Sequence, residues 1–390
     1  MDLVPGDGGR LLAVVGLLAL TGAVAAPAGA AGDAPDTRDA PDTRVAAVVA
    51  RDLRDHPEMP GEAVDARAPG LALAVAAGYA DVATKRPLTV DTPFRIASVT
   101  KTFVAATALK LAEQGRLDLD APIDTLLSPR TAAILAADRY PIDRITVRQL
   151  LGHTAGLFDY ASSAAYDART AADPSHLWTR EEQVRLAVDH GEPLAPPGAK
   201  FHYSDTGYVL LGEIIERSTS VDIGTAVRTV LDFDTLGLAD TWWEALEAAP
   251  PGLPPLAHQY DGREFDGATL HPSYDLYGGG GLVSTVGDVT TFFRALFDGD
   301  VFADPATLET MRTVSRPGRA EGGALGLFRY RIAGVPCWGH PGFWGTVAYA
   351  CPDRDLAFTI ATNQADESSI DTTRLERAVV REARRAAGSR

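Results

Sequence analysis

The sequence predicts an α+β fold in which an antiparallel sheet is interrupted by an inserted, mostly helical region. Three observations carry this prediction: a helix and a strand near the start, a long helical middle, and closely spaced strands followed by one helix at the end. The folded domain is expected over 45–390, with the sheet formed by 45–97 and 277–390 and the helical region by 98–276.

The composition is that of an ordinary globular protein. Of 390 residues, 46% are hydrophobic and 23% are charged. The formal net charge of −16 repels phosphate backbones, so we expect no nucleic-acid partner. No H-E-x-x-H, Walker A, G-x-G-x-x-G or G-x-S-x-G pattern occurs. We therefore expect neither a metal nor a cofactor, and no α/β-hydrolase nucleophile elbow.

The first 44 residues are expected to lie outside the domain. Residues 11–32 are uncharged and apolar and run into an A-x-A pattern, which predicts a signal peptide over 1–30 that is cleaved near Ala30. A retained membrane anchor is the alternative. Residues 31–44 contain the tandem repeat DAPDTR and predict a polar linker. The expected location is secreted or in the cell envelope, without stable membrane insertion after cleavage.

The domain is expected to open with a helix and a buried strand. Val45, Val48, Val49 and Leu53 recur at helical spacing behind Thr43 as a possible N-cap. A short apolar run at 71–77, bracketed by turn residues, predicts the strand.

Helices dominate the middle of the chain. One is expected from Ser98 to Gly115, and another opens at the capping box of Thr146 and Gln149. A third is expected over 206–216, and the Pro- and Gly-interrupted stretch 240–272 is expected to be mostly loop.

The end of the chain favours sheet. A glycine run at 278–281 precedes a strand at 282–284, and Thr285 opens a helix. The remaining expected elements are strands at 328–332, 337–340, 346–351 and 356–362, and a closing helix at 374–386.

Ser98 and Lys101 are candidates for nucleophilic chemistry. Their spacing places the hydroxyl and the amine on one face of the helix. A buried lysine at a helix N-terminus tends to lose its proton, and the neutral amine can then take the proton of the serine. Taken alone, S-x-x-K is common by chance, and a surface Ser and Lys are the alternative.

Five blocks in a fixed order give this pair its context. The sequence resembles the serine penicillin-recognising enzymes of the class C β-lactamase and DD-carboxypeptidase type, which also include esterases and D-aminopeptidases. The resemblance implies a β-lactamase/transpeptidase-like α/β/α sandwich. The matching blocks lie at 92–101, 150–157, 197–208, 279–285 and 339–342.

The resemblance implies acyl transfer. Ser98 attacks a carbonyl, Lys101 and Tyr203 pass its proton to the leaving group, and water later releases the acyl group. The implied oxyanion hole is the backbone N–H of Ser98 and of Phe343. For Tyr203, a core aromatic with a satisfied hydroxyl is the alternative.

The third motif, His340 to Gly342, is expected to bind substrate. His340 stands where many relatives carry a lysine, and it can hydrogen-bond a substrate carboxylate, more strongly when protonated. A surface strand histidine is the alternative.

Asp205 departs from the asparagine of the second motif. Its carboxylate cannot donate to a substrate carbonyl and favours a charged Lys101. This weakens the case for β-lactam or peptide substrates relative to esters and shifts the role of base toward Tyr203. Residues 204–206 can also be aligned as a variant S-D-N motif, although the flanking residues fit the Tyr-based form better.

A second departure concerns the first hairpin. Relatives usually have two strands between their Pro-Gly and Gly-Tyr-Ala-Asp segments, whereas only 71–77 separates Pro69-Gly70 from Gly78 here. One strand is therefore expected to be missing, which would leave a smaller sheet edge.

Cys337 and Cys351 flank a loop centred near residue 344. In a hairpin they face each other, so an exported protein is expected to join them by a disulfide worth about 3 kcal/mol. Two reduced core thiols are the alternative.

Together these features predict an exported active-site-serine hydrolase that acts on a small-molecule or peptidoglycan-peptide substrate. D-alanyl-D-alanine carboxypeptidase-like and esterase-like activities are the first expectations. A β-lactamase is the alternative that Asp205 disfavours. A non-catalytic peptidoglycan- or penicillin-binding envelope protein is the other, and a pure binder needs no proton relay. No oligomeric state is predicted.

Overall fold

The computed structural model describes residues 40–262, 265–365 and 371–388. The predicted signal peptide and the linker as far as residue 39 lie outside the described residues. Within the described part, no helix is long and apolar enough to cross a membrane.

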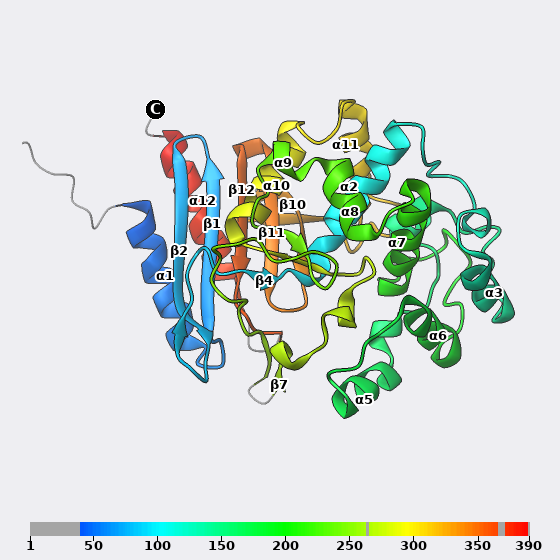
Figure 1. The fold of residues 1–390 in the computed structure, drawn as a ribbon. Helices are drawn as coiled ribbons and strands as arrows, with labels where there is room; N and C mark the ends of the chain where they lie inside the picture. Colours follow the sequence, from blue (N-terminus) through cyan, green and yellow to red (C-terminus); the bar gives the residue numbers. More distant parts are fainter. Residues whose placement is uncertain (1–39, 263–264, 366–370, 389–390) are drawn as a thin grey trace, which may run out of the picture. The chain divides into compact units, whose positions relative to one another are not determined.

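A seven-stranded antiparallel sheet forms one side of the domain (Figure 1). Strands from the start of the chain pair with strands from its end, because β1 lies beside β12. The structure thereby confirms an antiparallel sheet built from both ends of the chain. In spatial order the strands are β3 (Arg86–Pro87), β2 (Leu71–Asp81), β1 (Gly61–Ala68), β12 (Leu356–Ala361), β11 (Thr346–Cys351), β10 (Val335–Gly342) and β9 (Phe328–Ile332).

The expectation of a missing strand was wrong. Strands β1 and β2 form a complete hairpin around Pro69-Gly70, paired from Gly61 opposite Gly78 to Ala68 opposite Leu71. The strand that was expected to be missing is β1, which precedes the Pro-Gly turn instead of following it. Its sequence hides it, because Glu62 and Asp65 are buried there and break the alternation of apolar and polar residues.

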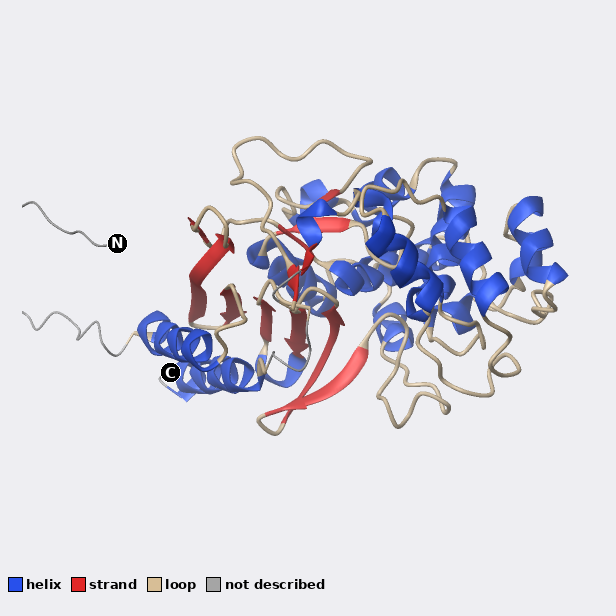
Figure 2. Cartoon of the chain, turned by 90° about the horizontal axis from the view of Figure 1, so that it is seen from below, coloured by secondary structure: helices blue, strands red, loops and turns tan. Residues whose placement is uncertain are grey.

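Two terminal helices cover one face of the sheet. Figure 2 shows α1 (Pro41–Asp55) and α12 (Thr373–Gly388) side by side along it. Their apolar residues share one buried cluster with the strands, which includes Val45, Val379 and Phe358. An ion pair of 2.5 Å between Arg44 and the buried Glu382 joins the two helices.

Helix α1 begins at Pro41 rather than near Val45, so residues 41–44 belong to the helix and not to the linker. Ala40 is its N-cap, and Thr43 is not. The proline explains the earlier start, since its fixed φ suits the first helical position and its missing N–H costs nothing there.

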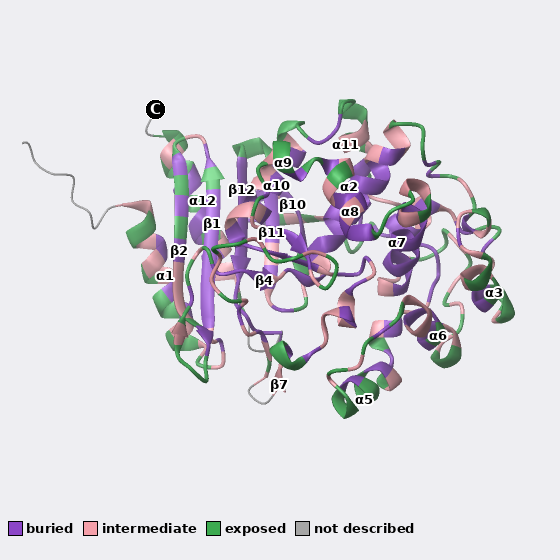
Figure 3. Cartoon of the chain, viewed as in Figure 1, coloured by how far each residue is buried: buried purple, intermediate pink, exposed green. Residues whose placement is uncertain are grey.

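The opposite face of the sheet carries α10 (Val286–Asp298), and α2 (Thr100–Glu113) packs against α10 through Phe103, whose ring stacks on that of Phe292 at 3.6 Å. Thr100 to Leu109 are all buried, and Figure 3 shows α2 enclosed between the sheet and the helical region. A helix that is buried on every side needs no amphipathic pattern, which fits its run of Ala, Val and Leu.

The inserted region is mostly helical, as predicted. The capping box of Thr146 and Gln149 forms and opens α4 (Val147–Leu151), and Ser204 caps α7 (Asp205–Thr219). A small sheet of β4 (Phe94–Arg95), β8 (Leu282–Ser284) and β5 (Trp242–Trp243) connects this region to the main sheet. The other elements are α3 (Pro129–Ala137), α5 (Ala164–Ala172), α6 (Arg180–His190), α8 (Ile223–Leu231), α9 (Phe233–Leu236), α11 (Pro305–Met311), β6 (Tyr260–Asp261) and β7 (Phe265–Asp266).

Candidate active site

Ser98 and Lys101 meet where the chain enters the central helix. Ser98 lies in a 3-10 turn at Ala97–Val99 that leads directly into α2, and Ala97 adopts a φ of 44° there. Lys101, one turn later, is fully buried, and its Nζ donates to Ser98 Oγ at 2.7 Å. Ser98 itself is only half-buried, so its hydroxyl can be reached from outside. The structure thus brings the two residues of S-x-x-K together.

The ammonium of Lys101 makes two further hydrogen bonds. Its Nζ donates to Asp205 Oδ1 at 2.5 Å and to the backbone oxygen of Gly279 at 2.6 Å. Three donated bonds use all the hydrogens of a charged amine. The glycine run makes this approach possible, because a Cβ at Gly279 would lie 2.6 Å from Asp205 Oδ1 and a Cβ at Gly280 would overlap the carboxylate of Asp275.

The surroundings of Lys101 favour the charged amine, as expected from Asp205, and not the neutral amine expected from S-x-x-K alone. Burial alone lowers the pKa of Lys101, but the carboxylate of Asp205, together with Tyr203 and Asp275, raises it above its ordinary value. The expectation that Asp205 would favour the charged amine agrees with this direction. The resting site therefore holds an ammonium–carboxylate pair beside the serine.

Tyr203 lies at the same place, just before α7. Its ring centroid is 5.1 Å from Lys101 Nζ, and the ring stacks on His153 at 4.4 Å. Burial raises the pKa of Tyr203 strongly; Lys101 opposes this and Asp205 adds to it. The phenol is therefore neutral, so it can take the proton of Ser98 only while it passes its own proton on.

His340 lies in β10 and is 1% exposed, so it is not a surface strand histidine. Its Nδ1–H donates to the carbonyl of Pro341 at 2.6 Å, and its Nε2 has no partner among the described residues. Burial and then the charge of Lys101 lower the pKa of His340 to about 3. With Nδ1–H bound to the carbonyl of Pro341, only Nε2 remains for a substrate, and it could donate to a carboxylate only in the protonated ring, which the lowered pKa of His340 disfavours.

Gly342 and Phe343 bring the end of β10 to the serine. A Cβ at Gly342 would collide with the carbonyl of Ile96, so glycine is needed for this close approach. Phe343 follows in the turn before β11 and is 50% exposed. Ser98 and Phe343 line the same pocket, as two backbone donors of one oxyanion hole must.

The predicted cysteine pair is joined in the structure. Cys337 in β10 and Cys351 in β11 form a disulfide across adjacent strands, with the two Cα atoms 4.1 Å apart. It ties together the two strands on either side of the turn that carries Phe343.

Two carboxylates at the site were missed by the sequence reasoning. Asp159 Oδ1 accepts from the backbone N–H of Asp205 at 2.9 Å, and Asp275 lies beneath the glycine run. Burial, and then the carboxylate of Asp205, raise the pKa of both Asp159 and Asp275. Their positions next to two of the matched blocks, 150–157 and 279–285, were the available signal.

A pocket of about 130 Å³ opens beside Ser98. Asp205, Asp275 and Phe343 line it, and the rest of its wall is mainly aromatic. None of its lining residues is Lys or Arg. It is large enough for the small acyl or alcohol part of a substrate.

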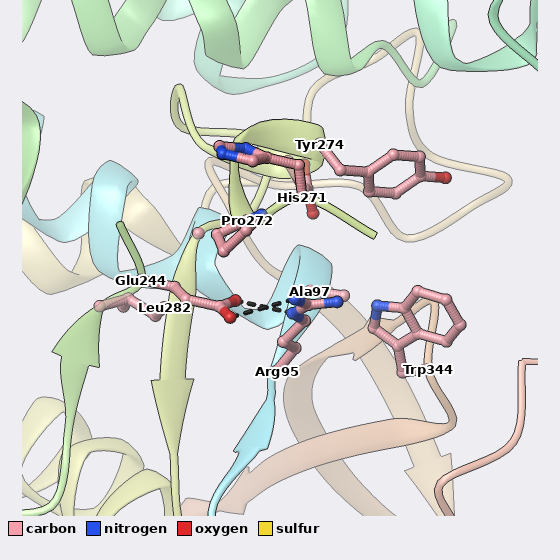
Figure 4. A pocket seen from close by; sticks show the side chains of 10 residues that line it. Arg95, Ala97, Glu244, His271, Pro272, Tyr274, Leu282 and Trp344 are labelled. Carbon is pink, nitrogen blue, oxygen red and sulfur yellow. Dashed lines mark hydrogen bonds and ion pairs between the residues drawn. The ribbon is translucent and has the colours of Figure 1, made fainter. Parts of the chain in front are cut away.

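A smaller cavity of about 20 Å³ adjoins this pocket and shares Tyr274, Asp275 and Trp344 with it (Figure 4). Arg95 lines it, but its guanidinium faces Glu244 at 2.7 Å and also donates to the carbonyls of Gly267 and Leu270. Arg95 therefore stabilises the loop around Gly267 and Leu270 and is not a free cation for an anionic substrate.

The fold, and a half-exposed serine beside a buried lysine and a tyrosine, define the class of active-site serine hydrolases. The chain belongs to the Beta-lactamase family, whose model matches residues 49–381. The predicted β-lactamase/transpeptidase-like fold and the predicted class of enzyme are thereby confirmed.

Proteins with several different names are similar in sequence to this chain. The chain is 30% identical over 302 residues to esterase EstB of Burkholderia gladioli. The aligned region covers 71% of this chain and 74% of that protein. It is 28% identical over 247 residues to Penicillin-binding protein 4* of Bacillus subtilis, over 60% of this chain and 51% of that protein. The chain thus spans about half the length of the second relative.

Among solved structures, a D-stereospecific amidohydrolase from Streptomyces sp. is similar, with a TM-score of 0.70 and 29% identity over 83% of this chain and 96% of that one. A D-amino acid amidase from Ochrobactrum anthropi SV3, complexed with D-phenylalanine, has a TM-score of 0.71 and 26% identity over 90% of this chain and 99% of that one.

Proposed function

We propose that this protein is an exported serine esterase that forms an acyl-enzyme on Ser98. The observation that supports this proposal best is the charge at the site. Lys101 is bound to Asp205 at 2.5 Å, and the third motif presents a neutral His340 in place of a cation. Penicillins and peptides that end in D-Ala-D-Ala carry a carboxylate, for which this pocket offers no free positive charge. A neutral ester has no carboxylate and therefore needs no positive charge in the pocket.

The proton path follows from the charge states. As Ser98 Oγ attacks the ester carbonyl, its proton passes to Tyr203 while Tyr203 passes its own proton to the oxygen of the leaving alcohol, so the phenol stays neutral throughout. Lys101 stays charged and stabilises the negative charge that develops between Ser98 and Tyr203. Water then attacks the acyl group and the same path returns the proton to Ser98. The products are the alcohol and the free acid.

The leaving group also favours esters over amides. An alkoxide is a better leaving group than an amide nitrogen and needs a less complete proton transfer. Asp205 cannot donate to a substrate carbonyl as the amide of asparagine can, so the side-chain help that an amide bond needs is reduced. D-alanyl-D-alanine carboxypeptidase and β-lactamase activities are accordingly placed second.

Burst kinetics with three donors test the proposal. The wild type, Ser98→Ala and the control Ser175→Ala, an exposed serine of the helical region, are mixed with p-nitrophenyl acetate, a D-Ala-D-Ala peptide and a penicillin. We expect a burst and turnover with the ester, lost in Ser98→Ala and kept in Ser175→Ala. Turnover of the peptide or penicillin in preference to the ester would overturn the esterase assignment. No turnover and no adduct with any donor would favour a binding protein.

Export is supported by two features. The disulfide between Cys337 and Cys351 is of a kind that persists in oxidising compartments, and residues 11–32 have the character of a signal sequence. Expression of the full chain in a bacterial host should release a protein that begins after residue 30, while a form lacking residues 1–30 stays in the cytoplasm. An uncleaved chain recovered from the cytoplasm would contradict export.

A further inference from the structure

The pocket beside Ser98 has an aromatic wall. Tyr160 and Tyr166 are almost fully buried, and their rings meet edge to face at 5.2 Å. Tyr274 stacks on Tyr166 at 5.2 Å, and Trp344 completes the wall. Aromatic rings are favourable neighbours for a cation, and more so when the cation is removed from water.

Carboxylates line the same pocket. Asp275 accepts no hydrogen bond from any side chain or backbone group in the part of the chain that the structure describes, although its environment is largely closed. Asp205 bonds Lys101 through Oδ1 only. Asp167, exposed at the rim on α5, forms no ion pair with a described residue. Three carboxyl groups therefore line the pocket, and because burial and Asp205 raise the pKa of Asp275, a cation bound there would favour the ionised form of Asp275.

A second acceptor without a donor lies close by. His340 is 1% exposed and its Nε2 has no partner among the described residues, while its Nδ1 is occupied by the carbonyl of Pro341. Its ring lies 6.2 Å from that of Tyr203. Buried acceptors are normally paired, so the carboxylate of Asp275 in the pocket lining points to a ligand that brings donors or positive charge, while His340 is not among the lining residues.

We propose that the pocket beside Ser98 binds a positively charged ammonium group of the substrate, with Asp275 and Asp167 as counter-charges and the tyrosines as an aromatic wall. This rests on the proposed function, because it names the substrate class of the same site. The ammonium belongs either to the acyl part or to the alcohol part of the ester, and the experiment distinguishes the two.

Matched probes isolate the charge. For the acyl part, the p-nitrophenyl ester of 4-(trimethylammonio)butanoic acid is compared with its uncharged isostere, p-nitrophenyl 5,5-dimethylhexanoate. For the alcohol part, acetylcholine is compared with 3,3-dimethylbutyl acetate. Each kcat/KM ratio is divided by the ratio of the hydroxide-catalysed rates, which removes intrinsic reactivity. We expect the corrected ratio to favour the cation about tenfold or more in one of the two pairs.

Variants assign the preference to the pocket. Asp275→Asn keeps the shape of the side chain and should bring the corrected ratio down toward one, and Asp167→Asn should lower it partly. Asp300→Asn removes one negative charge from an exposed loop outside the pocket and should leave the ratio unchanged. Should Asp275→Asn fail to fold, Asp167→Asn still reports on the pocket.

Corrected ratios at or below one in both pairs would overturn this inference while leaving the esterase proposal intact, because the neutral esters would still be hydrolysed. A preference that survives both pocket variants would overturn it as well. Failure of every ester, neutral and charged, would instead overturn the proposed function on which the inference rests.

Discussion

The ammonium nitrogen of Lys101 lies 2.5 Å from Oδ1 of Asp205. Asp205 occupies the position at which the second motif of the resembled family has an asparagine. This contact decides the charge of the site, since without a carboxylate the burial of Lys101 would drive its pKa down. The lysine is thus held as a cation and not as a free base. Tyr203 remains as the group that exchanges a proton with Ser98.

Replacing Asp205 should move the pH dependence of the reaction. In Asp205→Asn the desolvation of Lys101 is no longer opposed by that carboxylate, so the pKa of Lys101 falls. If the charged amine is the active form, the loss of kcat/KM at high pH will begin at a lower pH than in the wild type. A pH–rate profile with p-nitrophenyl acetate measures this, with Asp300→Asn as the control. An unmoved alkaline limb would show that Lys101 does not act as a cation.

Gly342→Ala should uncouple β10 from the serine. The new Cβ would meet the backbone carbonyl of Ile96, which cannot move aside as a side chain can, so the strand end must shift away from Ser98. We expect kcat/KM to fall by about a hundredfold or more, since displacing one oxyanion donor has such an effect. Gly287→Ala is the control, because its Cβ would have no neighbour closer than 3.6 Å. Equal activities of the two variants would refute the role of this close approach.

The disulfide should carry measurable stability. Replacing both Cys337 and Cys351 by serine removes a cross-link that closes a loop of 14 residues. The free energy of unfolding should drop by about 3 kcal/mol, as loop-closure estimates give. Chemical denaturation with and without a reductant measures it: the wild type should lose stability when reduced, and the double variant should not respond.

Glu62 should make stability depend on pH. Burial, with a further contribution from Asp52, raises the pKa of Glu62 from 4.5 to about 8 in the folded state. The folded state therefore favours the protonated acid, and this contribution to stability is present below the unfolded pKa and is lost as pH rises through about 8.

Glu62→Gln removes this titration. At pH 9 the variant should be more stable than the wild type, by up to about 5 kcal/mol, and near pH 4 the two should be alike. Glu309→Gln, at an exposed position of α11, should follow the wild type. Thermal unfolding midpoints across this pH range provide the measurement, and parallel curves for wild type and Glu62→Gln would contradict it.

Local sequence signals were enough for most of the fold. The capping box of Thr146 and Gln149, the helix that Thr285 opens and the strands near the end of the chain depend on neighbouring residues, and they appear where predicted. Strand β1 was missed because its buried Glu62 and Asp65 look like surface residues in the sequence. Their burial depends on packing with distant parts of the chain.

Some features of the site also follow from the local sequence, and others do not. Ser98 and Lys101 are close because they are one helical turn apart, and this follows from the sequence. Asp205 in the second motif also indicated a charged Lys101, whereas the neutrality of His340 and the presence of Asp275 depend on groups far apart in the chain that meet only in the folded protein. Electrostatics of this kind cannot be predicted from motif spacing.

The most direct test of the account is to locate the acyl group. The protein is quenched in acid during turnover of p-nitrophenyl acetate, digested, and its peptides are analysed by mass spectrometry. The account predicts one added acetyl group on the peptide that contains Ser98, with none on that peptide in Ser98→Ala. An acetyl group found on Tyr203 or another residue instead, or turnover that persists in Ser98→Ala, would contradict it.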